Sequence, residues 1–185
     1  IINGAECEPY ITADYREIVE NSWGVISGVN ILLEVLEVKR VLIGIEDNKP
    51  EAIDVLTRIA EKDDRINVVK LKSRYPQGAE KMLIYAMTGR KVPPGKLPAD
   101  VGVIVMNVNS VSFIAEYVKT GMPLIKKRVT VDGSAVAQPA NVEVLIGTPL
   151  ADVFEACGGF KSEPKKILMG GPMMGIAQYS LQTSV

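Results

Sequence analysis

Short apolar runs alternate with longer helical patterns over the first 120 residues of the chain. The run 40–46 (Arg-Val-Leu-Ile-Gly-Ile-Glu) is almost continuously apolar, which is typical of a strand buried on both faces. Similar runs cover 66–71 and 101–106, and the chain opens on two isoleucines. Strands that alternate with helices favour a parallel sheet with right-handed crossovers. We therefore predict an α/β fold, with a Rossmann-like parallel-sheet domain over residues 1–120.

Helical patterns link these strands. The first begins at Thr12 or Asp14, and its apolar residues recur at steps of three and four, so one unbroken helix is expected to about Leu36. The second follows 47–51, where Pro50 suits the first turn of a helix. Further helices are expected from 80 to 87, with Gly89 at the end, and over 112–119.

The pattern changes after residue 120. Strands are predicted over 126–132 and 141–146, a short helix over 148–157, and another strand over 166–169. Strand, strand, helix, strand is the order of a β-grasp module. We therefore expect a small α+β domain over residues 121–185.

Composition excludes several classes of function. The chain is 47% hydrophobic and 23% charged with a net charge of −1, which indicates a globular protein and no nucleic-acid partner. No apolar run approaches the roughly 20 residues of a membrane span. Histidine is absent, so His-based triads, general bases and metal ligands are excluded. The chain opens on Ile within an expected strand, and we expect it to be a fragment of a longer protein.

Three loops that follow predicted strands are rich in polar residues: 3–10, 75–80 and 107–110. In a parallel sheet these loops share one edge, where ligands of open α/β folds bind. Glu6 and Glu8 would repel a phosphate, so they suit hydroxyls or ring N–H groups. The start of the helix after Asn107 is the better phosphate site, with Asn109 and Ser110 as neutral donors. Together with the flat ring of Tyr75 and the bare backbone of Gly78, these groups favour a nucleotide-like ligand.

Simpler interpretations remain open at this point. A metal site is conceivable if Glu6, Glu8, Asp47 and Glu80 converge from separate loops. Asn107 and Ser110 are also ordinary helix-capping residues, and the acidic loop 46–48 is well explained as helix capping. Cys7 is more readily a packing residue than a redox thiol.

The stretch 3–14 (Asn-Gly-Ala-Glu-Cys-Glu-Pro-Tyr-Ile-Thr-Ala-Asp) closely resembles the C subunit of the Rnf (Rsx) electron-transport complex. Residues 43–50, 75–81 and 169–175 match that family too. The family is similar to the NADH-binding flavoprotein subunit of respiratory complex I. The resemblance implies a Rossmann-like FMN and NADH domain followed by an SLBB-like (soluble-ligand-binding β-grasp) domain.

The resemblance also implies a function. Hydride would pass from NADH to FMN, and electrons would then reach 4Fe–4S clusters outside this chain, with no residue acting as a catalytic base and no metal held here. The expected partners are the other Rnf subunits and, for the complex, ferredoxin, at the cytoplasmic face of the bacterial inner membrane as a peripheral protein. By motif, the implied FMN and nucleotide residues are Asn3, Ala5, Glu6, Cys7, Glu8, Tyr75, Gly78, Glu80, Asn107 and Ser110, with Glu8 near the nicotinamide nucleotide.

Departures from the family pattern limit these expectations. Cys7 stands where the complex I relatives have serine, and Ala79 where they have a second glutamate. The glycine-rich loop expected upstream and the cluster cysteines expected downstream are not in this sequence, so weak or no FMN binding and no activity are expected of this chain alone. Two rival hypotheses are a cobalamin reductase of bacterial microcompartments and a docking scaffold without a flavin.

Overall fold

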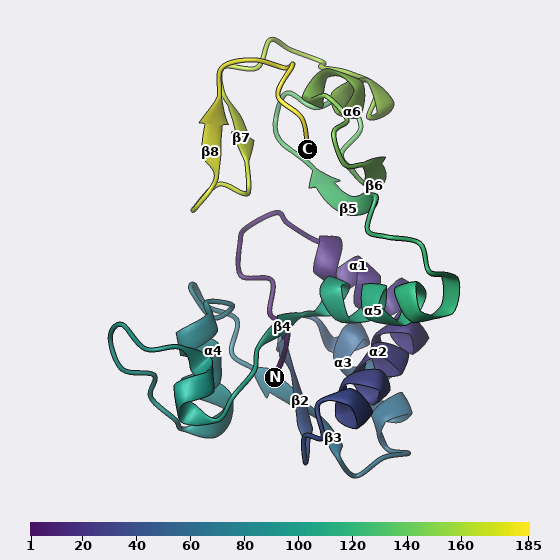
Figure 1. The fold of residues 1–185 in the computed structure, drawn as a ribbon. Coiled ribbons are helices and arrows are strands. Elements are labelled where there is room, and N and C mark those ends of the chain that lie inside the picture. The colour runs from purple at the N-terminus through teal and green to yellow at the C-terminus, as the bar shows by residue number, and fades with distance from the viewer. The chain divides into compact units, whose positions relative to one another are not determined.

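A computed structural model describes all of residues 1–185, and the chain forms two compact units (Figure 1). The first unit comprises residues 1–7 and 14–122, and the second comprises residues 8–13 and 123–185. The first loop of the chain is thus divided, because its later residues belong to the second unit.

The first unit is built on a four-stranded sheet in the order β3-β2-β1-β4, in which every neighbouring pair is parallel. The predicted parallel α/β fold is confirmed. The predicted strands at 40–46 and 66–71 correspond to β2 and β3. The four strands are β1 (Ile2–Gly4), β2 (Val41–Glu46), β3 (Ile66–Leu71) and β4 (Met106–Asn107).

Helices cover both faces of this sheet (Figure 1). One face carries α2 (Ser22–Val35), α3 (Pro50–Ala60) and α5 (Val108–Thr120), whose apolar side chains pack on the fully buried Ile43 and Ile45 of β2. The other face carries α4 (Glu80–Thr88), whose Leu83 packs near Leu71. Apolar side chains therefore cover the sheet on both faces, as the continuous apolar runs predict.

The long helix predicted from residue 14 to residue 36 is wrong in one respect, because it is interrupted at Asn21. The structure has α1 (Ala13–Glu20) and then α2, with Asn21 at φ −130° and ψ 37° between them. The Asn21 side chain donates a hydrogen bond of 2.8 Å to the Glu17 carboxylate. Asparagine commonly offers the chain such local bonds as an alternative to continued helix, which explains the break.

The fourth strand is much shorter than the predicted 101–106. A 3₁₀ turn, η1 (Pro98–Val101), and Gly102 at φ 67° occupy the start of that stretch and redirect the chain. Helix α5 then begins at once after β4, earlier than predicted, because the Asn107 side chain caps it by accepting a bond of 2.9 Å from the Asn109 N–H.

The second unit has two antiparallel strand pairs around one helix. Its core contains Val131, Val144, Val153 and Cys157. The expected last strand pairs with a further strand that the sequence did not predict, rather than with the first pair. The elements are β5 (Lys126–Val131), β6 (Ala140–Leu145), α6 (Leu150–Ala156), β7 (Ile167–Met169) and β8 (Ile176–Gln178).

The segment 8–13 joins this unit through Thr12. The Thr12 N–H donates to the hydroxyl of Thr130 at 3.0 Å, and the Asn141 side chain donates to the Thr12 hydroxyl at 2.8 Å. The segment is therefore held by both strands of the first pair.

None of the helices combines the length and apolar character that crossing a membrane requires.

Candidate functional site

The structure brings residues 3–7 of the first predicted loop, together with the predicted loops 75–80 and 107–110, to the carboxyl edge of the parallel sheet. Asn3 of β1 is the register partner of Asn107 on β4. The Asn3 side chain donates a hydrogen bond of 3.0 Å to the Gly78 carbonyl, in the loop between β3 and α4. Asn3 thus lies beside the end of β4 and also binds the loop between β3 and α4. These three loops were expected to meet at one edge of the sheet.

Gly78 is needed for contact between the first and second loops. A Cβ atom at this position would clash with the Ala5 carbonyl oxygen and would lie 3.2 Å from the Cys7 sulfur. Ala5 is buried and Cys7 is half-buried, as a free thiol. The backbone of the first loop therefore packs directly on Gly78, where a side chain would not fit.

Glu6 is used within the protein as the cap of α1. Its carboxylate accepts hydrogen bonds from the backbone N–H groups of Asp14 at 2.8 Å and Tyr15 at 3.3 Å, and the Lys49 ammonium lies 3.9 Å away. Burial raises the pKa of the Glu6 carboxyl, although the N–H donors of the helix oppose that rise. Its acceptor oxygens are therefore already engaged.

Glu46 is a site feature that the sequence analysis missed, and the interpretation of 46–48 as helix capping is wrong for this residue. The residue at the end of β2 is 2% exposed, and burial raises the pKa of its carboxyl, while Lys49 and the backbone N–H groups of Arg74 and Glu6 oppose that rise. The residue at the α3 cap position is Lys49, with no side-chain cap bond. The available signal was a single charged residue closing an otherwise apolar strand.

Asp14 occupies the amide donors that were predicted for a phosphate. The Asn107 side chain donates to Asp14 Oδ2 at 2.8 Å, and the Asn109 side chain donates to Asp14 Oδ1. Burial raises the pKa of the Asp14 carboxyl, and the two amides oppose that rise. Ser110, in the first turn of α5, is exposed, and its side chain takes no part in these bonds to Asp14.

The second loop presents other exposed groups. Tyr75 is 43% exposed, and Glu80 is exposed at the first position of α4. Gln77, which the sequence analysis did not select, is only 3% exposed, and its Nε2 has no hydrogen-bond partner. Its Oε1 accepts a bond of 3.0 Å from Arg74, so Gln77 supports the loop from within.

Glu8 belongs to the second unit, and its carboxylate is bound by the loop between β7 and β8. Its two carboxylate oxygens accept hydrogen bonds of 2.9 Å from the backbone N–H groups of Met173 and Met174. A Cβ atom on Gly171 would lie 2.6 Å from Glu8 Oε2, and this glycine has φ 99°. The loop forms a concave set of N–H donors around a carboxylate, an arrangement that suits anions.

No group of three or more Cys, Asp or Glu side chains in residues 1–185 is arranged to hold a metal ion. The proposed set of Glu6, Glu8, Asp47 and Glu80 does not form such a group.

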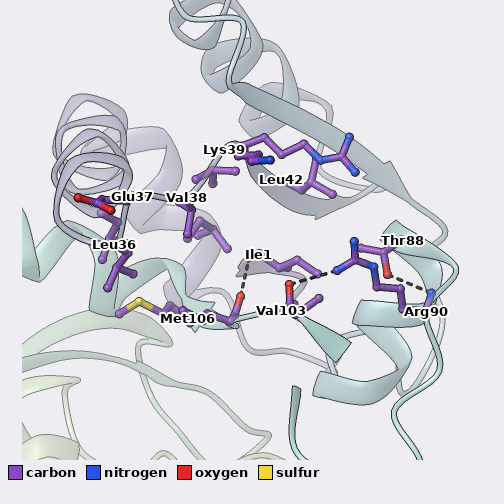
Figure 2. Close-up of a pocket in the computed structure, with 16 residues that line it drawn as sticks. Ile1, Leu36, Glu37, Val38, Lys39, Leu42, Thr88, Arg90, Val103 and Met106 are labelled. Carbon is purple, nitrogen blue, oxygen red and sulfur yellow. Dashed lines mark hydrogen bonds between the residues drawn. The ribbon is translucent and has the colours of Figure 1, made fainter. Parts of the chain in front are cut away.

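A cleft of about 530 Å³ lies at the opposite, amino edge of the sheet (Figure 2). Its walls come from the starts of β1, β2 and β4 and from the connection between α2 and β2. Arg90 contributes its guanidinium, which donates to the carbonyls of Val101 and Gly102 at 2.8 Å and 3.1 Å. None of the ten predicted site residues lines this cleft.

Two domain families match the chain. The family described as "Nuo51 FMN-binding domain" matches residues 1–116, and the family described as "SLBB domain" matches residues 128–177.

Similar curated proteins are C subunits of ion-translocating complexes. The C subunit of the proton-translocating ferredoxin:NAD(+) oxidoreductase complex of Clostridium ljungdahlii is 51% identical over 100% of this chain and 40% of its own length. The C subunit of the Na(+)-translocating complex of Acetobacterium woodii is 48% identical over 97% of this chain and 40% of its own length. The chain thus spans 40% of the length of these two relatives.

Among solved structures, the chain resembles part of an NAD+-reducing nickel–iron hydrogenase in the air-oxidized state. The TM-score is 0.80 at 20% identity, and the match covers 98% of this chain and 36% of the hydrogenase chain. At this identity the likeness supports the fold alone.

Proposed function

Because this chain belongs to the Nuo51 FMN-binding domain family, we propose that it is the FMN- and NADH-binding part of the C subunit of an Rnf-type ion-translocating ferredoxin:NAD+ oxidoreductase complex. Support comes from relatives that are 43% to 51% identical and bear the names of such subunits. Since the chain spans 40% of the length of two of them, the proposed activity belongs to a longer subunit.

One observation carries this proposal. The loops after β1, β3 and β4 meet at the carboxyl edge of a parallel sheet, and Asn3 binds the second loop directly through the Gly78 carbonyl. That edge is where open α/β folds bind nucleotides. A polar edge of this kind within an FMN-binding family supports a flavin there.

The predicted residues divide into a frame and an exposed set. Four of them form the frame, because they are engaged with other loops or with α1: Asn3, Ala5, Glu6 and Gly78. The exposed set, which we assign to direct ligand contact, is Tyr75, Glu80, Asn107 and Ser110, and for Asn107 this role requires its side-chain amide to release the Asp14 carboxylate. Ser110 and the first turn of α5 suit the FMN phosphate, because neutral donors there act together with the positive end of the helix dipole.

Two further residues have separate proposed roles. Cys7 lies against Gly78 and is assigned to the same loop contact. Glu8 is assigned to the nicotinamide nucleotide, and this role requires its carboxylate to exchange the N–H groups of Met173 and Met174 for hydroxyls of the nucleotide.

When bound, FMN supplies the chemistry that links a hydride donor such as NADH to one-electron acceptors. The residues of this chain bind and orient the ligands, and none of them has to act as a general base. The expected acceptors are 4Fe–4S clusters, each of which needs about four thiolates. Cys7 and Cys157 are the only cysteines here, so other parts of the subunit would hold the clusters.

The proposed setting is a peripheral position at the cytoplasmic face of the cell membrane. The other subunits of the complex would be the direct partners, and ferredoxin would be the redox partner of the complex. The names of the relatives support this setting, since they describe ferredoxin:NAD(+) oxidoreductase complexes that translocate ions.

The two rival hypotheses lack comparable support. The relatives described above are C subunits of ion-translocating complexes, which favours this function over a cobalamin reductase of microcompartments. A docking scaffold without a flavin is disfavoured by the match of residues 1–116 to an FMN-binding family.

The visible spectrum of the purified full-length protein tests the proposal. We expect the absorption bands of bound flavin together with iron–sulfur absorption. A colourless protein free of flavin and iron would overturn the proposal. For the 185-residue chain alone we expect weak or no FMN binding, and saturable binding at micromolar FMN would contradict that expectation.

A further inference from the structure

The loop between β7 and β8, residues 170–175, binds the Glu8 carboxylate with two successive backbone N–H groups. Met173 donates to Glu8 Oε2 and Met174 donates to Glu8 Oε1, each at 2.9 Å. Hydrogen bonds from backbone N–H groups to a carboxylate are charge-assisted and stronger than those between neutral groups. The bonded residues are 165 and 166 positions apart in the sequence, so this contact is not a local turn. Glu8 is therefore held by a distant loop whose donors suit an anion.

Gly171 makes room for this carboxylate. Its φ of 99° lies in the left-handed region, and an added Cβ atom would lie 2.6 Å from Glu8 Oε2. The Gly175 N–H donates to the Gly171 carbonyl at 2.9 Å, which closes the turn that carries the two donors. A side chain at position 171 would therefore push the flexible end of Glu8 out of the loop.

The contact is open to solvent, so it can break without leaving its polar groups unpaired. Glu8 is half-buried, and Met173 and Met174 are 55% and 75% exposed. Because water can replace the protein partners at such a place, the net stabilisation from the two bonds is modest. A contact of this kind suits a carboxylate that changes partners.

Under the proposed function, the loop and the nicotinamide nucleotide bind the same carboxylate. We propose that the 170–175 loop competes with the nucleotide for Glu8 and is thus an autoinhibitory contact of the nucleotide site. This inference rests on the proposed function, which assigns Glu8 to the nucleotide. A molecule in which the loop holds Glu8 binds the nucleotide poorly, so the apparent affinity falls as that state becomes more populated. A change that frees Glu8 should therefore strengthen nucleotide binding.

The substitution Gly171→Ala in the full-length protein tests the proposal. Its methyl group excludes the Glu8 carboxylate from the loop, so we expect NAD+ to bind about three- to tenfold more tightly in isothermal titration calorimetry. The matched control is Gly170→Ala, because Gly170 also has a left-handed φ, of 106°. A Cβ atom there would meet only Gly175 Cα, at 3.4 Å, so the control strains the same loop without displacing Glu8. Its affinity for NAD+ should stay within about twofold of the unmodified protein.

Amide hydrogen exchange supplies a measurement that needs no substitution. In the unmodified full-length protein, the amides of Met173 and Met174 are bonded to Glu8 and should exchange slowly. Saturating NAD+ should make both amides exchange faster, because Glu8 leaves them. In Gly171→Ala both amides should exchange fast without NAD+, and adding NAD+ should change them little.

The outcomes separate competition from other roles of the loop. Exchange at Met173 and Met174 that stays the same or slows when NAD+ binds would overturn the proposal. NAD+ affinity in Gly171→Ala that is equal to or weaker than in Gly170→Ala would also overturn it, since the loop would then be neutral or would help Glu8 to bind. If Gly171→Ala does not fold, the exchange measurement on the unmodified protein decides.

Failure of the underlying function gives a different result. An unmodified full-length protein that binds no NAD+ contradicts the proposed function. NAD+ binding that is unchanged in Glu8→Ala contradicts the assignment of Glu8 to the nucleotide. If Glu8→Ala weakens NAD+ binding while Gly171→Ala does not strengthen it, only the competition is contradicted.

Discussion

The two edges of the parallel sheet differ in how their charged groups are used. At the carboxyl edge, the carboxylates of Glu6, Asp14 and Asp47 accept hydrogen bonds from other segments of the chain. At the amino edge, a cleft of about 530 Å³ is lined by Glu37, Lys39 and Arg40, which are exposed. The cleft therefore lies at one edge, and the carboxylates that are hydrogen-bonded to other segments lie at the other edge.

Under the proposed function the flavin site is the carboxyl edge, so the volume of the amino-edge cleft does not locate that site. A binding site needs polar groups fixed in direction, and the carboxyl edge has them because its loops are joined to one another. Substitutions at the two edges should therefore have unequal effects on FMN binding in the full-length protein.

The largest difference is expected between two glycines. Gly78→Ala would force the second loop away from the Ala5 carbonyl, so we expect loss of FMN binding and a fall of about 1–3 kcal/mol in the free energy of unfolding. Gly102→Ala at the amino edge is the control, because its φ of 67° makes it destabilising by about 1–2 kcal/mol without touching the loops. Fluorescence titration and urea unfolding measure both quantities. Equal loss of FMN affinity in the two variants would abolish the distinction between the edges.

The next effect concerns Asp14. In Asp14→Asn one of the two amides of Asn107 and Asn109 loses its acceptor, so we expect the free energy of unfolding to fall by about 1–3 kcal/mol. Glu37→Gln removes an exposed carboxylate at the amino edge and should change the free energy of unfolding by less than about 0.5 kcal/mol. Urea unfolding of both variants gives the comparison, and equal losses would contradict it.

A smaller, pH-dependent effect is expected from Glu6. Burial raises the pKa of Glu6 in the folded protein, so the folded state binds its proton more tightly than the unfolded state. The stability that this residue contributes is present below the ordinary pKa of 4.5 and is lost as pH rises through the raised pKa. Relative to Glu6→Gln, the unmodified protein should therefore lose stability as pH rises from about 4 to about 7, by about 1.4 kcal/mol for each pH unit by which the pKa is raised. Urea unfolding of both proteins at a series of pH values measures this change. A difference in unfolding free energy between them that does not vary with pH would contradict the prediction.

The smallest effect is expected from Lys39→Ala. Lys39 is exposed at the amino-edge cleft, so FMN affinity should stay within about twofold and unfolding free energy within about 0.5 kcal/mol. If Lys39→Ala weakened FMN binding tenfold, the amino-edge cleft would have a role in FMN binding, which contradicts the proposed site at the carboxyl edge.

The fold was largely predictable from sequence because its strands are local signals. Strands β2 and β3 follow from continuous apolar runs, and the left-handed Gly89 ends α4 as expected. The break at Asn21 was missed because an asparagine side chain overrode a correct helical period. The shortness of β4 was missed because an apolar run there is partly taken up by the turn at Gly102.

The candidate site was less predictable, because its contacts join residues far apart in sequence. The three loops could be named from their composition, and the parallel sheet placed them together. The burial of Glu46 and the bond from Asn107 to Asp14 depend on which segments pack together, and no local pattern specifies that. The residue roles in ligand binding stay predictions.

The division of the first loop between the two units has a practical consequence for dissecting the molecule. The chain passes from one unit to the other between Cys7 and Glu8, between Ala13 and Asp14, and again between Met122 and Pro123. A protease cut at the last of these points therefore liberates no complete unit. A peptide of residues 123–185 would lack Thr12, which bonds with Thr130 and Asn141, and would leave the Met173 and Met174 amides without the Glu8 carboxylate. A shortened version that is meant to keep the second unit intact should therefore include residues 8–13 together with residues 123–185.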